Sequence, residues 1–253
     1  MAQCDFGKAI LFSDARAESL DLNGIELVKI PPIQTIDQYS HFVLKELAPH
    51  VSTSHALIIQ WDGFVIGGHL WQEDFLAFDY LGAPWVQGPG KGQVGNGGFS
   101  LRSKRLLDIL AQGDFDAHNP EDLCICVEHK KRLEHEHQVR FAPIELATHF
   151  SCERGDWHPA FGFHGLFNLP NFMSEGQLGT YVSTLPPDLC GSKDARHLIR
   201  TLMKRADYRN ASVVLQKRIQ SQGWTRDNLL LKLRLLFSAL AHTPPPRAHS
   251  GNH

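Results

Sequence analysis

The 253-residue sequence lacks several features that would assign it to a functional class at once. No apolar run is long enough to cross a bilayer, because the leucine runs near the C-terminus are interrupted by Lys232 and Arg234. The net charge of −2 is not the strongly positive charge typical of proteins that bind nucleic acid, and no run of basic residues suggests binding to an anionic membrane. The first residues lack the basic and apolar regions of a secretory signal. We therefore expect a cytoplasmic protein with no transmembrane segment and no nucleic-acid partner.

Two phosphate-binding motifs are also missing, and cysteine is scarce. The glycine-rich stretch 82–98 contains neither the Gly-Lys-Ser/Thr ending of a P-loop nor the GxGxxG dinucleotide fingerprint. Five cysteines are an odd number, and Cys124 and Cys126 cannot easily pair with each other. We therefore expect reduced thiols, with these two cysteines in the core. A pair spaced by one residue, with no second pair nearby, is only a weak signal for zinc.

What the sequence does contain is a succession of strand and helix patterns. Apolar or alternating runs predict strands at 9–14, 25–30 and 53–60, and helical spacing predicts a helix at 38–47. This order favours an α/β sheet over an all-helical or sandwich fold. Downstream we expect a short helix or turn at 71–78, helices at 105–110 and 120–126, a strand at 139–142, and helices at 194–206, 211–222 and 225–240. Candidate N-caps are Thr35 or Asp37 for the first helix and Ser100 or Ser103 for the helix at 105–110.

A change of composition near residues 186–187 divides the chain. Before it lies the α/β pattern, which we assign to a domain over 1–180. After it the sequence is helical and basic, so we expect a helical extension over 187–242 whose exposed Lys and Arg residues form a solvated face. The remaining segment, 243–253, contains three consecutive prolines and should be disordered.

Asp62 is the first residue that could carry chemistry. It follows an apolar run and stands at the tip of a predicted buried strand. Ligands of open α/β sheets collect beyond the carboxyl ends of strands, and a carboxylate there can bind a hard divalent cation that bridges nucleotide phosphates. An acid in a turn, with Gly63 supplying unusual dihedral angles, explains the position equally well.

The second candidate is the sequence Asn96, Gly97, Gly98. Two adjacent glycines allow a backbone to approach a ligand closely, and exposed amides there can bind sugar hydroxyls or phosphate. A plain hairpin turn is about as good an explanation. The third candidate is the pair Glu121 and Asp122 at a predicted helix start. Such acids usually match the helix dipole, and the functional alternative is a general base for an attacking hydroxyl.

His164 is the fourth candidate, in a segment of glycines and aromatic residues. That setting suits a metal ligand or a phosphate contact, although an isolated histidine is more often structural. Trp61, Trp85 and Phe163 could stack on a sugar or a base, or could belong to the core.

Taken in order, these segments resemble a bacterial family of glycosyltransferase-like proteins that is assigned to the GT-A fold. The resemblance covers about residues 6–171. It is carried by six segments in matching order and spacing: 39–47, 59–64, 79–85, 94–102, 120–122 and 161–165. It implies a GT-A-like, Rossmann-like mixed sheet flanked by helices, followed by the C-terminal helical extension.

The same order is distantly similar to the β-1,4-galactosyltransferases, in which an Asp-x-Asp motif holds manganese and the diphosphate of the UDP-sugar. Asp62 matches the second acid of that motif, Asp122 the catalytic base that follows a glutamate, and His164 the late metal ligand. Gly97 and Gly98 match the Gly-Gly loop. By this analogy the residues that contact donor or acceptor are Gln60, Asp62, Asp79, Trp85, Asn96, Gly97 and Gly98.

The sequence departs from this pattern in two places. Gln60 replaces the first acid of the motif and removes one negative charge. GT-A folds also begin with a strand that cradles the nucleotide base, and in the relatives this strand precedes the segment that matches 4–14. We therefore expect that strand to be missing here.

The resemblance implies an inverting transfer from a nucleotide-sugar, such as a UDP-sugar, to a hydroxyl of a glycan or another acceptor. Asp122, or else Glu121, would act as the base, and Asp62 and His164 would hold Mn²⁺ or Mg²⁺. Two alternatives remain open. One is a non-catalytic relative that binds carbohydrate or nucleotide, and the other is a metal-dependent hydrolase in which water replaces the acceptor.

Overall fold

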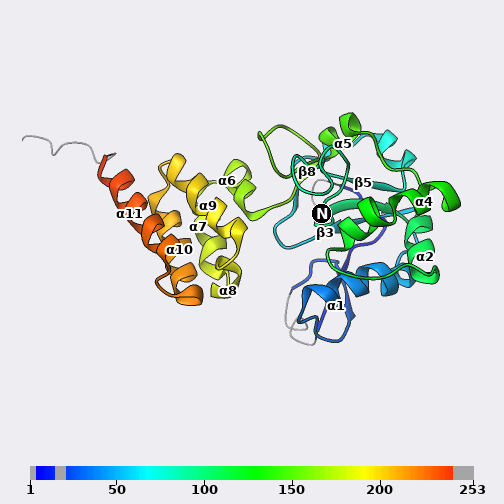
Figure 1. Cartoon of the computed structure of the whole chain (residues 1–253), viewed down its shortest axis with the longest axis horizontal. Coiled ribbons are helices and arrows are strands. Elements are labelled where there is room, and N and C mark those ends of the chain that lie inside the picture. The colour runs from blue at the N-terminus through cyan, green and yellow to red at the C-terminus, as the bar shows by residue number, and fades with distance from the viewer. Residues whose placement is uncertain (1–3, 15–20, 242–253) are drawn as a thin grey trace, which may run out of the picture. The chain divides into compact units, whose positions relative to one another are not determined.

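The computed structural model describes residues 4–14 and 21–241 of the chain (Figure 1). It divides into two compact units, Met1–His164 and Gly165–His253, which are described separately below. The segment 243–253, for which disorder is predicted, lies outside the described residues.

The first unit is built around a three-stranded antiparallel sheet in the order β3–β6–β5. The strands are β3 (His55–Ile59), β6 (Phe99–Ser103) and β5 (Tyr80–Gly82). Ile59 lies opposite Phe99, and Tyr80 lies opposite Arg102. The central strand β6 is buried along its whole length. Because β3 and β6 run antiparallel, the end of β3 and the beginning of β6 meet at the same edge of the sheet.

Two smaller sheets accompany this one. Strands β1 (Ile10–Ser13) and β2 (Glu26–Lys29) pair in parallel. Strand β8 (Gly162–Phe163) lies between β4 (Phe64–Val65), to which it is antiparallel, and β7 (Ser151–Cys152), to which it is parallel. The prediction of an α/β fold is therefore confirmed at the level of a mixed α/β unit with small sheets. The three strands predicted before residue 61 are β1, β2 and β3.

The helices of the first unit begin where the sequence provides caps. The Thr35 side chain accepts a hydrogen bond from the backbone N–H of Gln38 at 3.2 Å, in a capping box, and the Ser103 side chain accepts one from that of Leu106 at 3.0 Å. The helices are α1 (Ile36–His41), α2 (Lys104–Gln112), α3 (Glu121–Leu123), α4 (Lys130–His137) and α5 (Ile144–Phe150), with π-helical continuations at Phe42–Glu46 and Cys124–Glu128 and 3₁₀ turns at Ala48–His50, Gly68–Leu70 and Glu73–Ala77.

The strand predicted at 139–142 is wrong. This segment forms only an isolated bridge between Tyr80 and Phe141. Pro143, which has no N–H to donate to a ladder, follows it directly, and α5 begins at the next residue. The segment is therefore too short to continue the sheet.

The core of the first unit is aromatic. Phe75, Phe99, Phe150 and Phe161 are fully buried, and their rings lie between 5.3 and 6.3 Å apart in edge-on or tilted pairs. Such pairs add to the stabilisation that the buried ring area already provides. Cys124 and Cys126 are fully buried in the same core, which confirms the prediction for both. All five cysteines are free thiols.

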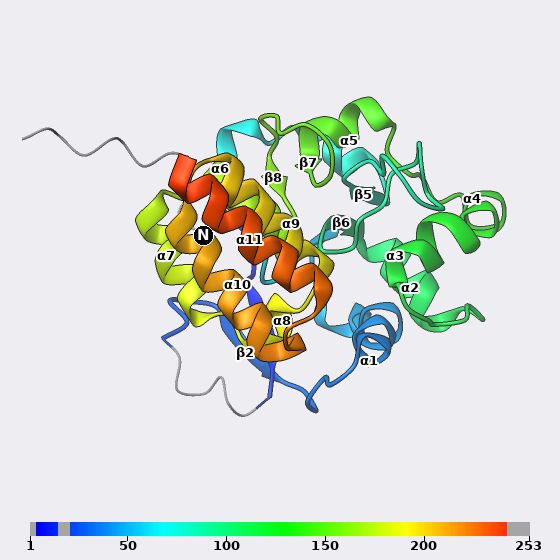
Figure 2. The same ribbon diagram turned by 60° about the vertical axis from the view of Figure 1, so that its left-hand side comes forward.

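The second unit is helical. Its helices are α6 (Leu169–Phe172), α7 (Glu175–Thr184), α8 (Pro187–Cys190), α9 (Lys193–Lys204), α10 (Tyr208–Gln222) and α11 (Arg226–Ala241). The last three are the helices predicted beyond residue 193. The central helix is α10, which packs against α7, α8, α9 and α11 (Figure 2). No helix in the described part of the chain has both the length and the apolarity needed to cross a membrane.

The boundary between the units falls at His164/Gly165, earlier than the 180–187 interval expected from composition. Side chains of α10 explain the difference, because they bind the backbone at both ends of α7. Asn210 Nδ2 donates to the carbonyl of Glu175 at 3.1 Å, and Lys217 Nζ donates to those of Ser183 and Leu185, each at 2.6 Å. Residues 165–186 therefore belong to the helical unit.

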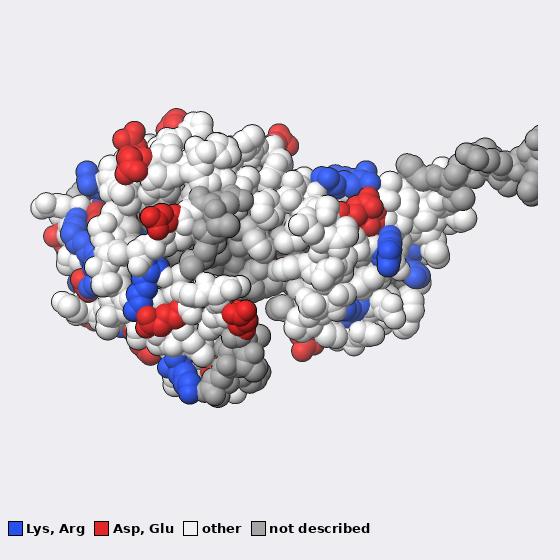
Figure 3. All heavy atoms as spheres, turned by 180° about the vertical axis from the view of Figure 1, so that it is seen from behind, with Lys and Arg blue, Asp and Glu red and all other residues white. Residues whose placement is uncertain are grey.

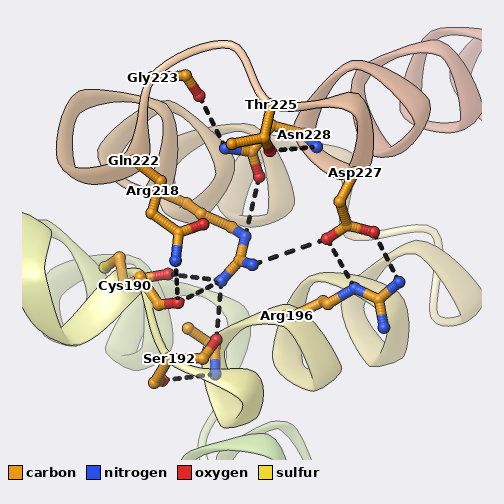
Figure 4. Close-up of polar contacts among 11 residues, drawn as sticks. Cys190, Ser192, Arg196, Arg218, Gln222, Gly223, Thr225, Asp227 and Asn228 are labelled. Atoms are coloured by element: carbon orange, nitrogen blue, oxygen red, sulfur yellow. Dashed lines mark hydrogen bonds and ion pairs between the residues drawn. The ribbon is translucent and has the colours of Figure 1, made fainter.

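Arg218 on α10 holds the start of α11 to the helices beside it (Figure 4). Its guanidinium donates to the side chain of Asn228 at 2.9 Å and to the carbonyls of Gly191 and Ser192, each at 2.7 Å. Asp227 lies 3.6 Å from Arg218 and accepts two hydrogen bonds from Arg196 on α9, at 2.6 and 2.7 Å. One buried arginine therefore supplies donors both to the connection between α8 and α9 and to the start of α11.

We predict that Arg218→Met lowers the stability of the second unit by about 2–4 kcal/mol, because the substitution leaves several buried acceptors without a donor. Hydrogen exchange measured by mass spectrometry over 165–241 should rise, and α11 should show the largest increase. Arg209→Met, an exposed arginine of the same helix, is the matched control and should change exchange little. Equal exchange in the two variants would contradict the role of Arg218.

Candidate functional site

The candidate site lies where β3 ends and β6 begins. The Gln60 N–H donates to the carbonyl of Gly98 at 2.8 Å, and the Gly63 N–H donates to that of Gln60 at 2.9 Å. The tight turn after β3 thus places Asp62 beside the glycine loop that precedes β6. This contact is a direct result of the antiparallel pairing of the two strands.

On one side of the loop, His164 lies between two carboxylates. Its Nε2 is 3.1 Å from Asp62 Oδ1, and its Nδ1 is 3.5 Å from Glu153 Oε1. The backbone N–H of His164 donates to the Cys152 carbonyl at 3.0 Å, which fixes the residue at the end of β8. Burial opposes the charged imidazolium, but the neighbouring carboxylates of Asp62 and Glu153 outweigh it and raise the pKa of His164 to about 10. The histidine is therefore a cation at neutral pH.

On the other side of the loop lies a buried ion pair. Arg102 on β6 is fully buried, and its Nη2 donates to Glu121 Oε1 at 2.9 Å. Its Nε donates to the Ser100 hydroxyl at 3.1 Å, and its guanidinium lies 5.2 Å from the centre of the Tyr80 ring. A buried charge is stable only when it is paired and hydrogen-bonded, and here Glu121 supplies the opposite charge.

Asp122 differs from its neighbour Glu121. Its carboxylate accepts hydrogen bonds from the N–H of Gly97 at 3.1 Å and from that of Leu123 at 2.9 Å, and the residue remains partly exposed. Burial raises the pKa of Asp122, and the charge of Glu121 raises it further. A carboxylate that is accessible and more basic than usual is suited to accept a proton.

The glycine loop is in close contact with both groups. A Cβ added at Gly97 would lie 1.8 Å from Glu121 Oε1, and one added at Gly98 would lie 2.2 Å from His164 Nε2. No larger residue fits between the two groups. The Gly97 N–H donates to the Asp122 carboxylate, and the Gly98 N–H donates to the side-chain oxygen of Asn96 at 3.0 Å. Both amides therefore donate within the chain itself.

Asn96 completes the loop. Its φ of 62° lies in the left-handed region, which asparagine tolerates better than most residues. It is buried, and within the described part of the chain its Nδ2 has no hydrogen-bond partner. A ligand oxygen at the loop could accept from this group.

The structure does not bring Asp79 into this arrangement. Its carboxylate accepts hydrogen bonds from the Ser103 hydroxyl at 2.6 Å and from the Arg140 N–H at 2.8 Å, and lies 3.4 Å from Arg105. Ser103 is the last residue of β6, whereas the site is at the first. Asp79 therefore joins β5 to the beginning of α2.

The aromatic candidates have different surroundings. The Trp85 ring packs on the backbone of Gly95, just before Asn96, so it supports the loop. Phe163 is fully buried and stacks on Phe64 with ring centres 5.6 Å apart. Trp61 is 47% exposed, next to Asp62.

Sequence reasoning missed three residues of the site: Arg102, Glu153 and Tyr39. Alternation along β6 puts Ser100 and Arg102 on the opposite face from the apolar residues, and this signal could have identified Arg102. Burial and then the charge of Glu121 raise the pKa of Tyr39 to about 12, while Arg102 and the Gln60 side chain act in the other direction. Tyr39 thus borders the same group from α1. No local signal identifies Glu153, because its partner is eleven residues away.

The predicted metal ligands fit a divalent ion only in part. Asp62 Oδ1 and His164 Nε2 are 3.1 Å apart, close to the roughly 3 Å that separates neighbouring ligand atoms on one small ion. Glu153 contacts the other ring nitrogen, where a carboxylate orients a ligating histidine. Among the described residues, no group of three or more His, Cys, Asp or Glu side chains could hold a metal ion. The chain thus offers two ligands and one orienting carboxylate.

The raised pKa of His164 predicts a pH-dependent stability. Because its pKa is about 10 in the folded state and 6.5 in the unfolded state, protonation stabilises the fold fully below pH 6.5. This contribution is lost as the pH rises through 10. We expect the free energy of unfolding to fall by about 2–4 kcal/mol more in the wild type than in His164→Asn over this interval. Parallel stability curves from denaturant titrations would contradict the charged imidazolium.

Comparisons with known proteins give one finding about identity. No curated protein and no solved structure matches the chain. A family model, described as "Protein of unknown function (DUF5672)", matches residues 24–164. This segment is more than half of the chain and contains every residue of the site described above, from Tyr39 to His164. The chain belongs to the DUF5672 family.

Proposed function

We propose that the first unit is a glycosyltransferase that transfers a sugar from a nucleotide-sugar donor to an acceptor hydroxyl, with inversion. One observation carries the proposal. Asp122, whose pKa is raised, lies on one side of the Gly97–Gly98 loop, and the Asp62–His164 pair lies on the other side, with only the loop backbone between them. Transfer of a sugar from a diphosphate requires both parts, a base for the acceptor and a charged group for the leaving diphosphate.

Asp122 is the base in this proposal. Its carboxylate takes the proton of the acceptor hydroxyl, while the hydroxyl oxygen forms a bond to the anomeric carbon. The bond from that carbon to the diphosphate oxygen breaks, and the nucleoside diphosphate leaves with the electron pair. Glu121 is not suited to this role, because it is buried and paired with Arg102 at 2.9 Å. It instead keeps a negative charge beside Asp122, which helps to raise the pKa of Asp122.

Asp62, His164 and Asn96 form the donor side. A bound Mn²⁺ or Mg²⁺ would neutralise the charge that develops on the departing diphosphate. His164 must lose its proton to ligate such an ion, and Glu153 would then hold the ring in position. Without an ion, the same histidine carries a positive charge at neutral pH and can itself contact a phosphate. Gln60, which replaces an acid, makes the donor side less negative in either case.

The test is a transfer assay with UDP- and GDP-sugars against a panel of glycan and alcohol acceptors, with and without Mn²⁺. Release of nucleoside diphosphate and formation of a glycosylated product by mass spectrometry are the expected results. Diphosphate release at the same rate without any acceptor would support a hydrolase instead. Donor binding without release of diphosphate would support a non-catalytic carbohydrate- or nucleotide-binding protein.

A further inference from the structure

The charge of the chain is unequally divided between the two units. Residues 1–164 contain 13 Lys and Arg against 22 Asp and Glu, a net charge of −9. Residues 165–253 contain 12 against 5, a net charge of +7. The net charge of −2 for the whole chain conceals this division. A strongly basic part of a chain is typical of proteins that bind an anionic surface.

Helix α11 carries an exposed apolar face on this basic unit. Its residues Leu231 and Leu235 are buried against the rest of the unit. The opposite side exposes six large apolar side chains: Leu229, Leu230, Leu233, Leu236, Phe237 and Leu240, the last two at 69% and 71%. Helical periodicity places them on one continuous face, on the order of 600 Å², which is the upper end of what a soluble monomer leaves exposed. Trp224, 67% exposed, precedes the same helix.

A basic cavity opens beside this face, between α9 and α11. It has a volume of about 590 Å³. Its lining residues are His197, Arg200, Thr201, Met203, Lys204, Arg234 and Ser238, with no acid among them. Three of these side chains are permanently charged. On the face of the second unit seen in Figure 3, Lys and Arg side chains likewise outnumber acids.

The one acid on α11, Asp227, is paired mainly with arginines outside the cavity. It is occupied by Arg196, with two hydrogen bonds, and by Arg218 at 3.6 Å. These ion pairs lower the pKa of Asp227, hydrogen bonding by Arg196 being the largest cause. Arg200 shares the charge of Asp227 with these two arginines. The positive charges of Lys204 and Arg234 are thus left for an anion.

We propose that the second unit binds the surface of an anionic membrane, with the apolar face of α11 in the interface and a lipid phosphate in the basic cavity. An apolar helical face beside Lys and Arg matches a layer of apolar chains covered by anionic headgroups. The 16-residue helix α11 would lie along the surface, with Arg234 joining the apolar face to the cavity. This inference does not depend on the proposed function of the first unit.

Two other occupants fit the face less well. In a second copy of the chain, α11 would bring its own Arg226, Lys232 and Arg234 near those of its partner, with no unpaired acid on the helix to offset them. The undescribed segments of this chain, 1–3, 15–20 and 242–253, contain only two large apolar residues between them, Met1 and Leu20. They are therefore too polar to cover six large apolar side chains. The membrane surface alone matches both the apolar face and the basic cavity.

The test is flotation of the full chain with vesicles of phosphatidylcholine alone and with vesicles containing about a third phosphatidylglycerol. The wild type should float with the anionic vesicles only. The double variants Lys204→Glu/Arg234→Glu and Phe237→Gln/Leu240→Gln should each weaken binding by about tenfold or more, since the first reverses two charges and the second removes two large apolar side chains. Arg209→Glu, which reverses an exposed charge outside the cavity, is the matched control and should retain most of the binding.

Several results would overturn the proposal. Equal binding to neutral and anionic vesicles would show that the basic cavity does not bind a lipid phosphate. An equal loss of binding in Arg209→Glu and in Lys204→Glu/Arg234→Glu would show the same. No flotation, together with a dimer in sedimentation that dissociates in Phe237→Gln/Leu240→Gln, would identify a second copy as the occupant. No flotation of a monomer would reject a membrane surface outright. Complete loss of flotation in millimolar soluble glycerol phosphate would overturn the role of the apolar face, because the phosphate site alone would then account for binding.

Discussion

Replacing Arg102 with methionine is expected to lower the free energy of unfolding of the first unit by about 3–5 kcal/mol. Arg102 is fully buried, and its removal leaves the buried carboxylate of Glu121 with no opposite charge at hydrogen-bonding distance. Urea unfolding followed by tryptophan fluorescence measures the effect, because four of the five tryptophans lie in residues 1–164. If the Arg102–Glu121 pair did not stabilise the core, Arg102→Met would lower the free energy of unfolding much less.

Two further variants separate the ion pair from the loss of side-chain volume. Arg140→Met removes an exposed arginine of the same unit and should change the stability by less than about 0.5 kcal/mol. The double variant Arg102→Met/Glu121→Met removes both charges and should recover a large part of the loss, since the unpaired buried charge is then gone. If the double variant is as unstable as the sum of the two single variants, the pair does not act as a unit.

The second large effect is expected at Asp122. Asp122→Asn keeps the shape of the side chain but removes its ability to accept a proton, so the rate of sugar transfer should fall by about 10²- to 10⁴-fold. Donor affinity should change by less than about threefold, because Asp62, His164 and Asn96 remain. Single-turnover transfer measures the first quantity, and calorimetric titration of the donor measures the second.

The control for this variant is Asp114→Asn, an exposed acid of the same unit that lies outside the site. It should leave both quantities unchanged. Loss of donor binding and transfer together in a folded Asp122→Asn protein would show that Asp122 maintains the loop through its contact with Gly97, and not that it acts as the base.

Local patterns explain which parts of this fold the sequence predicts. The strands β1 to β3 and the caps at Thr35 and Ser103 depend on neighbouring residues, and the structure confirms them. The segment 139–142 has the composition of a strand, but Pro143 ends it before a ladder can form. The composition of residues 139–142 alone cannot show that helix α5 begins directly after Pro143 and leaves no room for a longer strand.

The site illustrates the same distinction. Asp62, Gly98 and His164 were separate candidates in the sequence. The structure places them in contact because the end of β3, the beginning of β6 and the end of β8 lie near one another. The partner of Glu121 could not be predicted, since Arg102 reaches it only through the pairing of β6 with its neighbours. Asp79 was assigned to ligand binding by analogy, and its carboxylate instead holds the chain at the far end of β6.

The boundary between the two units could not be predicted from composition either. Residues 165–186 resemble the preceding segment in their aromatic and glycine content, so the expected boundary lay near Pro186. The contacts of Asn210 and Lys217 with α7 assign them to the helical unit. These contacts join residues more than thirty positions apart, beyond the reach of any local pattern.

The most direct test of the proposed site is a thermal-shift titration with UDP, GDP and their sugars, with and without Mn²⁺. A donor at 100 times its dissociation constant should stabilise the chain by roughly 2.7 kcal/mol, which is readily measured. We expect one nucleotide-sugar to give such a shift in the wild type and in Asp122→Asn, and none in Asp62→Ala. The absence of a shift with any donor at saturating concentration, or an equal shift in Asp62→Ala, would contradict the account of Asp62 and His164 as the donor side of a transfer site.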